Sequence, residues 1–376
     1  TGMTFSAGAG AFVLSGNAVT LSGGVTNNSA SLQTVNLTSM TLGAAQTFNA
    51  GAGGLAVGAN VANGGFLLSW NGTANSTFSG ALGGTGGLTK LGTGILTLSG
   101  ADTFTGATSV SAGTLRLGST GSLGNGTSNT SSVTVANTAN LDLNGFTPTA
   151  NVTLNLNGAV SATVGALTNG SGTAASYGGG VVLQSASSIG GTGNITLGGN
   201  MTGAFALTKV GNGTLTMNGT TAATAVNLNA GTFTLGASNR LSDTSAVSIA
   251  GGSLNTGTAL TDTVGSFAMS SGSLLGTGTI TAATYALSGG TVTGNLGAGT
   301  TTVTTGTTTL NGTSASAAVN VNSGTLALGA TDRLDNAATV TVAGGTLNAG
   351  AFNDTVGTFN MSSGSLNGSG TITAGT

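Results

Sequence analysis

Residues 311–348 read NGTSASAAVNVNSGTLALGATDRLDNAATVTVAGGTLN, and they match residues 218–255, NGTTAATAVNLNAGTFTLGASNRLSDTSAVSIAGGSLN, at 21 of 38 positions. After a one-residue deletion, residues 355–374 match residues 263–282 at 16 of 20 positions. The offset before the deletion is 93 residues. Such a long duplication is typical of repeat architectures, because each structural unit contacts only its neighbours and a block can be inserted without disturbing distant contacts. We therefore expect a solenoid rather than a globular core.

A second, shorter period lies inside the long one. A Gly-Thr or Gly-Ser pair followed by an apolar residue recurs every 18–21 residues within each copy, starting at Gly213, Gly231, Gly252, Gly272, Gly324, Gly345 and Gly364. Each period carries short alternating segments such as Leu326-Ala327-Leu328 and Val340-Thr341-Val342. Alternation with a period of two places apolar side chains on one face of a strand and polar ones on the other. These segments are predicted to be half-buried strands.

About 20 residues with two or three strands is the length of one coil of a parallel β-solenoid. The sequence therefore predicts an all-β fold, a parallel β-helix of about 18–20 coils, with Leu, Val, Ile and Phe stacked inward in columns. Glycine supplies the corners that need positive φ. Asn at corners such as Asn144 and Asn157 is expected to bond to the equivalent residue one coil further on, in the manner of Asn ladders.

Composition removes several functional classes. The chain has 71 glycines, one proline and no cysteine, and charged residues make up 3% of it. Five Lys and Arg cannot form the basic stripe that nucleic-acid binding requires, so we expect no nucleic-acid partner. No run approaches the roughly 18 apolar residues of a membrane helix, so no membrane-spanning segment is expected. The first residues of the sequence do not resemble a signal peptide. We expect any signal peptide to be removed or to lie outside this segment.

Residues 86–118, GGLTKLGTGILTLSGADTFTGATSVSAGTLRLG, resemble the autotransporter-associated β-strand repeat, whose pattern runs LTK-x-G-x-G-x-L-x-L-x-G, then NTY-x-G, then a Val and GTL. A degenerate copy covers residues 206–236, and the blocks at 235–241 and 328–334 resemble repeats of very large autotransporter-like proteins. The resemblance implies a right-handed parallel β-helix, exported to the bacterial cell surface by a C-terminal translocator barrel and serving as stalk, adhesin or matrix fibre.

The domain prediction is one continuous β-solenoid over residues 1–376. Its parts are divergent coils at 1–85, autotransporter-type repeats at 86–118 and 206–236, and successive copies of the 93-residue repeat at 218–310 and 311–376, the second truncated.

A search for chemistry yields no candidate residue. The chain contains no histidine, so the Ser-His-acid triad is ruled out. The closely spaced acids of Asp332-Arg333-x-Asp335 become Asn239-Arg240-x-Ser242 in the companion repeat, which indicates a solvated turn rather than a glycosidase pair. Lys90 and Lys209 occupy equivalent repeat positions and are expected to be solvated strand-edge charges. The Gly-Gly pairs lack the aspartate of calcium-binding β-rolls. We predict no catalytic, cofactor-binding or metal-binding residue.

Three minor expectations follow from the same patterns. Threonine pairs at 214/216, 279/281, 339/341 and 371/373 could form a flat ice-binding array, although Thr also simply suits strands. Trp70, Phe66 and Phe78 are expected to fill the solenoid interior rather than to form a sugar-stacking patch. Because few groups titrate, we expect a melting temperature that is almost flat between pH 4 and pH 9.

The sequence thus favours a non-catalytic extracellular structural or adhesive fibre segment that resembles an autotransporter passenger stalk. It would be secreted or held at the bacterial cell surface, with a surface or polysaccharide ligand and self-association as the candidate partnerships. The alternative is a subunit of a self-assembling extracellular filament or sheath, because a nearly uncharged rod has little electrostatic repulsion to oppose association. A polysaccharide-active β-helix enzyme is a distant third.

Overall fold

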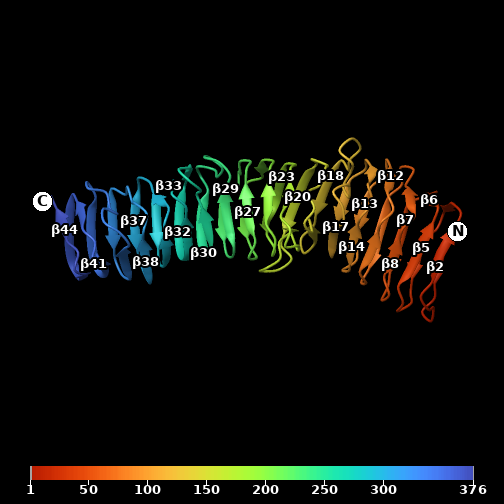
Figure 1. Cartoon of the computed structure of the whole chain (residues 1–376), viewed down its shortest axis with the longest axis horizontal. Helices are drawn as coiled ribbons and strands as arrows, with labels where there is room; N and C mark the ends of the chain where they lie inside the picture. The colour runs from red at the N-terminus through yellow and green to blue at the C-terminus, as the bar shows by residue number, and fades with distance from the viewer. Residues whose placement is uncertain (1, 376) are drawn as a thin grey trace. The chain divides into compact units, whose positions relative to one another are not determined.

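The computed structural model describes residues 2–375, which form 44 β-strands and no helix. They comprise about 19 turns of a parallel β-solenoid with about 20 residues each, so the predicted fold class and coil length are confirmed. The chain divides into two compact units, Thr1–Thr202 and Gly203–Thr376. Within each unit, successive coils lie side by side in chain order (Figure 1). The single continuous solenoid over residues 1–376 stays a prediction.

In the first unit, each coil contributes strands to two long parallel faces and a shorter third one. The first face contains β1 (Met3–Phe5), β4 (Val25–Asn27), β7 (Gln46–Ala50), β10 (Leu68–Gly72), β13 (Leu88–Lys90), β16 (Thr108–Val110), β18 (Ser132–Val135), β20 (Thr153–Gly158), the start of β23 (Val181–Ile189) and β25 (Met201–Thr202). The second contains β2 (Val13–Gly16), β5 (Gln33–Leu37), β8 (Leu55–Val57), β11 (Ser76–Phe78), β14 (Ile95–Leu98), β17 (Thr114–Leu117), β19 (Asn140–Asp142), β21 (Leu167–Thr168) and the end of β23. The third contains β3 (Val19–Leu21), β6 (Ser39–Leu42), β9 (Asn60–Ala62), β12 (Leu82–Gly84) and β15 (Thr103–Phe104), and further along the unit β22 (Ala175–Tyr177) pairs with β24 (Ile195–Leu197).

The second unit repeats this plan. Its first face contains β26 (Ala206–Lys209), β28 (Ala225–Leu228), β34 (Thr284–Leu287), β37 (Thr300–Val303), β39 (Ala318–Val321) and the starts of β30 (Ala246–Asn255), β32 (Ser266–Leu275), β41 (Thr339–Asn348) and β43 (Thr358–Asn367). Its second face contains β27 (Thr214–Met217), β29 (Thr232–Leu235), β35 (Gly290–Val292), β38 (Thr307–Leu310), β40 (Thr325–Leu328) and the ends of those four long strands. Its third face contains β31 (Thr261–Val264), β33 (Thr279–Ala282) and β36 (Asn295–Leu296), and then β42 (Asp354–Val356) paired with β44 (Ile372–Ala374).

The core is a set of inward columns, because alternate residues of most strands are buried in the pattern that the sequence predicts. Leu96, Leu115 and Leu141 lie in register on three successive coils and are fully buried. Stacking in register lets each coil cover the apolar surface of the next, and a fully buried Leu contributes about 1.5–3 kcal/mol. Backbone pairing and the columns thus hold the coils together.

Aromatic side chains fill part of the interior of the first unit. Trp70 and Phe78 are buried, and the Trp70 ring lies 5.4 Å from the ring centre of Phe48 and 5.8 Å from that of Phe78. The interior role predicted for Trp70 and Phe78 is therefore confirmed. Phe66 differs, because it precedes β10 and is 40% exposed. It lies at a corner, where alternation no longer directs side chains inward.

Glycine is required where two corners meet in successive coils. Gly113 and Gly231 are equivalent positions of the two autotransporter-type repeats, with φ of +65° and +63°. A Cβ atom at either position would lie 2.5 Å from a carbonyl oxygen of the preceding coil, Gly92 O or Gly211 O. Both the positive φ and this close approach exclude a side chain.

Candidate ligand-binding groove

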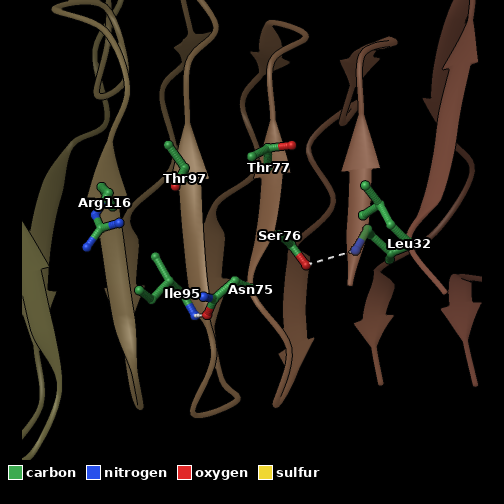
Figure 2. Close-up of a pocket in the computed structure, with 8 residues that line it drawn as sticks. Leu32, Asn75, Ser76, Thr77, Ile95, Thr97 and Arg116 are labelled. Carbon is green, nitrogen blue, oxygen red and sulfur yellow. Dashed lines mark hydrogen bonds between the residues drawn. The ribbon is translucent and has the colours of Figure 1, made fainter. Parts of the chain in front are cut away.

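The outer surface of the second face in the first unit carries a shallow groove across several coils. It has a volume of about 220 Å³ and is lined by Leu32, Leu55, Asn75, Ser76, Thr77, Ile95, Thr97 and Arg116. Leu32 directly precedes β5 and Asn75 directly precedes β11, and the other lining residues belong to β8, β11, β14 and β17, which lie side by side (Figure 2). In-register pairing aligns Thr77 with Thr97 and Thr97 with Arg116 on the outward side. Regular stacking therefore brings polar side chains from three coils into one row.

A missing side chain helps to create the hollow. Gly54 precedes β8, and a Cβ atom on it would lie 3.6 Å from Leu32 Cδ1 and 2.4 Å from the Asn75 carbonyl oxygen. Leu32 is 51% exposed, and Ile95 is half-buried across the groove. The groove thus combines an apolar contribution from Leu32 and Ile95 with the hydroxyl groups of the Thr row.

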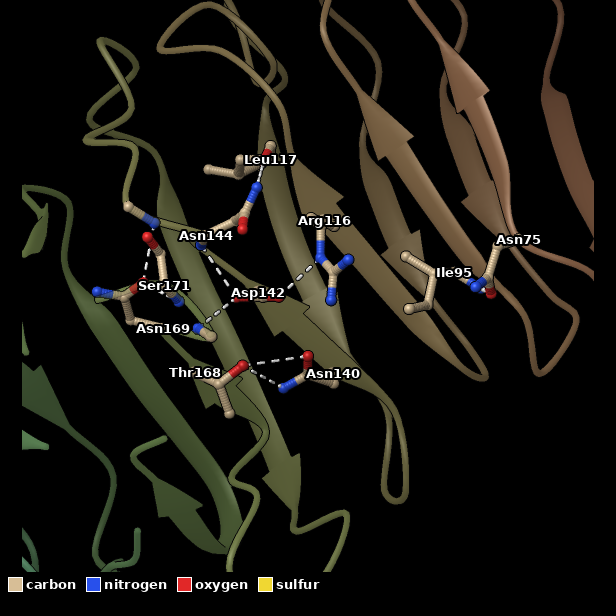
Figure 3. A network of polar contacts seen from close by, with 12 residues as sticks. Asn75, Ile95, Arg116, Leu117, Asn140, Asp142, Asn144, Thr168, Asn169 and Ser171 are labelled. Carbon is tan, nitrogen blue, oxygen red and sulfur yellow. Dashed lines mark hydrogen bonds and ion pairs between the residues drawn. The ribbon is translucent and has the colours of Figure 1, made fainter. Parts of the chain in front are cut away.

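Arg116 stands at one end of the groove, and its position is fixed by a buried carboxylate. Its Nε donates to Asp142 Oδ2 at 2.9 Å, with the Arg116 side chain 36% exposed and Asp142 buried. Asp142 Oδ1 accepts hydrogen bonds from the backbone N–H groups of Asn144 and Gly170, both at 2.9 Å. Asp142 faces outward from β19, but these two loop amides cover it (Figure 3).

Further amide side chains form hydrogen bonds in the loops and strands that surround Asp142. Asn169 Oδ1 accepts from the backbone N–H of Gly145 at 2.8 Å, and its Nδ2 donates to Thr173 O and Asn194 O. Asn140 Nδ2 donates to Thr168 Oγ1 at 3.0 Å, and the Thr168 hydroxyl donates back to Asn140 Oδ1. Arg116 is therefore held by a network extending over more than one coil (Figure 3).

The corner asparagines connect coils in a different way from the expected ladders. Asn144 has the predicted left-handed conformation, with φ of 50°. Its Nδ2, however, donates to the backbone carbonyl of Leu117, and Asn157 Nδ2 donates to Val135 O and to Gln184 Oε1. The expected bonds between equivalent asparagines are wrong for these two residues, because coils of unequal length place backbone carbonyl groups or a glutamine, not an equivalent asparagine, opposite them.

The two lysines lie inside the solenoid, so the expectation of solvated strand-edge charges is wrong. Lys90 and Lys209 are each 1% exposed. Lys90 Nζ donates to Gly92 O and Ala112 O, and Lys209 Nζ donates to Val210 O, Gly211 O and Ala230 O. Burial lowers the pKa of each ammonium group to about 8. The lysines bind carbonyl groups of two successive corners and link them.

Three aspartates are also inside, at the start of third-face strands. Asp102 Oδ1 accepts from the Leu82 N–H at 2.8 Å. Asp262 Oδ2 accepts from the N–H groups of Arg240 and Leu241, and Asp354 Oδ2 accepts from those of Arg333 and Leu334. The second carboxylate oxygen of all three aspartates is buried without a hydrogen-bond partner.

Burial is the main cause of the shifted acidity of these carboxyl groups. It raises the pKa of Asp102 to about 8, against the opposing effect of the Leu82 hydrogen bond. It also raises the pKa of Asp262 and of Asp354, which the backbone hydrogen bonds partly offset. The expectation of a melting temperature flat from pH 4 to pH 9 does not agree with these shifts.

In the second unit, arginine and aspartate together connect three successive coils. We call this arrangement the Arg–Asp connection: Asn218, Arg240 and Asp262 in one copy, and Asn311, Arg333 and Asp354 in the other. Arg240 Nη1 donates to Asn218 O at 2.7 Å in the preceding coil, while Asp262 in the following coil accepts from its backbone. Arg333 makes the same contact with Asn311 O at 2.7 Å.

The acids singled out beside Arg333 are turn residues. Asp332 is exposed with φ of 56°, equivalent to Asn239 with φ of 58°, and Asp335 Oδ1 accepts from the N–H of Ala337 at 2.7 Å. This agrees with the predicted turn. Residues 2–375 contain no group of three His, Cys, Asp or Glu side chains that could hold a metal ion.

The threonine pairs do not form one array. The pair at 214/216 lies on β27 of the second face and that at 339/341 on β41 of the first. The pairs at 279/281 and 371/373 belong to the third face, at β33 and β44. The flat ice-binding surface is therefore wrong, because the four pairs lie on three faces.

Comparisons with known proteins agree with the resemblance seen in the sequence. Residues 88–117, which form β13 to β17 beside the groove, match the family model described as passenger-associated-transport-repeat. The chain is also 50% identical over 72 residues to the adhesin BmaC autotransporter of Brucella suis biovar 1 (strain 1330). That match covers 19% of this chain and 2% of the relative. No solved structure matches.

The recognised resemblance to an autotransporter passenger repeat is thus confirmed. In the part of the chain that the structure describes, no helix has the length and apolar character needed to cross a membrane.

Proposed function

We propose that this chain is a non-catalytic extracellular segment that gives reach and adhesion to a bacterial surface protein of the autotransporter passenger type. The observation that carries the proposal is the passenger-associated repeat at residues 88–117, which lies within a regular parallel β-solenoid. The similarity to an autotransporter adhesin supports export to the cell exterior and an adhesive role.

The distribution of charge supports a structural and binding role rather than catalysis. The buried lysines and aspartates contact backbone groups of neighbouring coils, and these contacts explain their positions without a reaction. Asp332 and Asp335, the closest pair of acids in the sequence, occupy a turn. A glycosidase would instead need two carboxyl groups facing one another across a cleft.

Attachment of coated beads tests the adhesive role. Beads carrying the folded chain should attach to surfaces coated with acidic polysaccharide or to animal cells several-fold more than beads carrying the heat-unfolded chain. Attachment equal to that of the unfolded control would contradict the adhesive role. Release of reducing ends from the polysaccharide coat would contradict the non-catalytic role.

Sedimentation of the same preparation addresses the filament alternative. A monomer at micromolar concentration is expected for a passenger segment. Ordered fibres at that concentration would replace the adhesive proposal with a filament subunit.

A further inference from the structure

The groove contains the one charged side chain among residues 2–202 that reaches solvent. Residues 2–202 contain four charged side chains, of which Lys90, Asp102 and Asp142 are buried and Arg116 is 36% exposed. The buried Asp142 carboxylate offsets part of the Arg116 charge, but the terminal nitrogens of Arg116 are the charged donors that this otherwise uncharged surface presents to an approaching ligand. They favour a ligand with a negative group.

The guanidinium group presents a free fork to the groove. Asp142 takes the Nε–H, so the hydrogen bond leaves the two terminal nitrogens available beside Thr97 and Ile95 (Figures 2 and 3). The planar fork of Arg matches the two oxygens of a carboxylate. Because Asp142 and its loop amides already orient the side chain, binding requires little further loss of conformational freedom.

The rest of the groove indicates what carries the carboxylate. Thr77, Thr97 and Asn75 offer hydroxyl and amide groups, and Leu32 and Ile95 offer apolar surface. A pyranose ring has the matching combination of hydroxyl groups and C–H faces. The groove is shallow and open along the coils, as a chain of sugar residues requires.

A peptide strand lacks the backbone partners that it would need here. β8, β11 and β14 each pair with a strand on both sides, so their N–H and C=O groups are already bonded. Recognition by strand addition requires an unpaired edge. Side-chain recognition of a saccharide is therefore favoured over binding of an acidic peptide.

We infer that the groove from Leu32 to Arg116 binds an acidic polysaccharide, with the Arg116 fork holding the carboxylate of a uronic acid and the Thr77–Thr97 row contacting its hydroxyl groups. This inference deepens the proposed adhesive function and rests on it.

Calorimetric titration of the whole chain with hexagalacturonic acid tests the inference, with its methyl ester as the neutral probe. The acid should bind at least tenfold more tightly than the ester. Arg116→Gln should weaken binding of the acid about tenfold or more, since hydrogen bonds to charged groups are worth about that factor. Arg116→Lys keeps the charge without the fork, and its affinity for the acid should lie between that of the parent and that of Arg116→Gln.

Filling the groove provides a test that leaves Arg116 unchanged. Thr97→Trp should abolish binding by occupying the hollow. The matched control is Thr234→Trp, because Thr234 occupies the same outward position in β29, a strand with the same alternating burial as β14. That variant should bind as the parent does, and all variants should retain the parent's circular dichroism spectrum.

Several results would overturn the inference. They are equal binding of acid and ester, no binding of the acid by the parent chain, undiminished binding by Arg116→Gln, and a polyglutamate peptide that binds more tightly than the saccharide. If the saccharide fails to bind while coated beads still attach to cells, the groove inference fails and the adhesive function stands. If the beads also fail to attach, both fail.

Discussion

Arg116 in the first unit and Arg240 in the second show how similar residues serve different purposes in the same fold. Both arginines are associated with an aspartate of the following coil, Asp142 or Asp262. Arg240 uses its guanidinium group to bind backbone carbonyls, with Nε on Ser238 O at 3.0 Å and Nη1 on Asn218 O at 2.7 Å. Arg116 binds a carboxylate through Nε, and its fork faces a groove.

The difference indicates that, in this chain, an arginine site that is repeated in both copies of the 93-residue repeat has a structural role. The Arg–Asp connection occurs in both copies of the 93-residue repeat with the same contacts. Among residues 2–375, the ion pair of Arg116 with Asp142 occurs once, between coils of unequal length. We therefore assign the duplicated arginines to holding coils together and Arg116 to ligand contact.

The largest expected effect comes from placing a charge in an inward column of the second unit. Leu326 is 1% exposed in β40, so Leu326→Asp should destabilise its coil by several kcal/mol, because the charge has no partner inside. Limited proteolysis should then cleave within β38 to β41. The control is Ala327→Asp, on the outward side of the same strand, which should leave the digestion pattern unchanged. Unchanged protease resistance in Leu326→Asp would contradict the inward assignment.

The next largest effect shows how much the Arg–Asp connection contributes to stability and how much of this depends on the charge of Asp262. Asp262→Ala removes the acceptor of the Arg240 and Leu241 N–H groups and should cost about 1–3 kcal/mol in the free energy of unfolding. Asp262→Asn keeps an acceptor oxygen without a charge and should cost less at pH 8. Urea unfolding of both variants measures this. An alanine variant as stable as the parent would show that the connection holds nothing together.

The dependence of stability on pH follows from the buried groups. The folded-state pKa of Asp102 is raised to about 8, so its contribution to stability is complete below about pH 4 and is lost as the pH rises to about 8. Asp262 and Asp354 act in the same direction. The pKa of Lys90 and Lys209 is lowered to about 8, so they make the protein more stable as the pH rises from about 8 towards 10.5.

Melting temperatures should therefore fall from pH 4.5 to a minimum near pH 8 and then partly recover. Asp102→Asn should flatten the acidic part of this curve. A parent curve that is level from pH 4 to pH 9 would show that these carboxyl groups are hydrated in solution.

The smallest expected effect comes from replacing the equivalent arginine in each copy of the 93-residue repeat. Arg240→Gln and Arg333→Gln should each cost about 1 kcal/mol, and the two values should agree because both side chains make the same carbonyl contacts. Thermal unfolding of the two variants side by side measures this. Values differing by more than about 2 kcal/mol would contradict the equivalence of the two connections.

The coil plan could be predicted from the sequence because a single rule, alternation with a period of two, governs most strands. The same rule applied to charged residues predicts the burial of Lys90 and Asp262. Lys90 lies two residues from Leu88, and Asp262 lies two residues from Val264. Both charged side chains therefore point inward, as their apolar neighbours do. In this fold, a charged side chain is therefore not by itself evidence for solvent exposure. The long stem of lysine reaches corner carbonyls, and aspartate accepts amides that lack a strand partner.

The groove could not be predicted in this way. Leu32, Asn75 and Ile95 come from three coils, and they meet only because the coils stack in one particular register. The burial of Asp142 could not be predicted either. Its position in the alternation of β19 is on the outward side, and the backbone amides of Asn144 and Gly170 cover it. Contacts between loops of irregular length leave no periodic signal in the sequence.

Engineered disulfides test the central claim, parallel coils in register, most directly, because the natural chain contains no cysteine. Thr77 and Thr97 are aligned in adjacent coils, where paired strands lie about 4.8 Å apart, within reach of a disulfide. Arg116 is aligned one coil beyond Thr97, so its distance from Thr77 is about twice that and out of reach. Oxidation should cross-link the Thr77→Cys, Thr97→Cys variant rapidly and leave the Thr77→Cys, Arg116→Cys variant with two free thiols. Rapid cross-linking of the second variant, or none in the first, would contradict the stacked-coil fold.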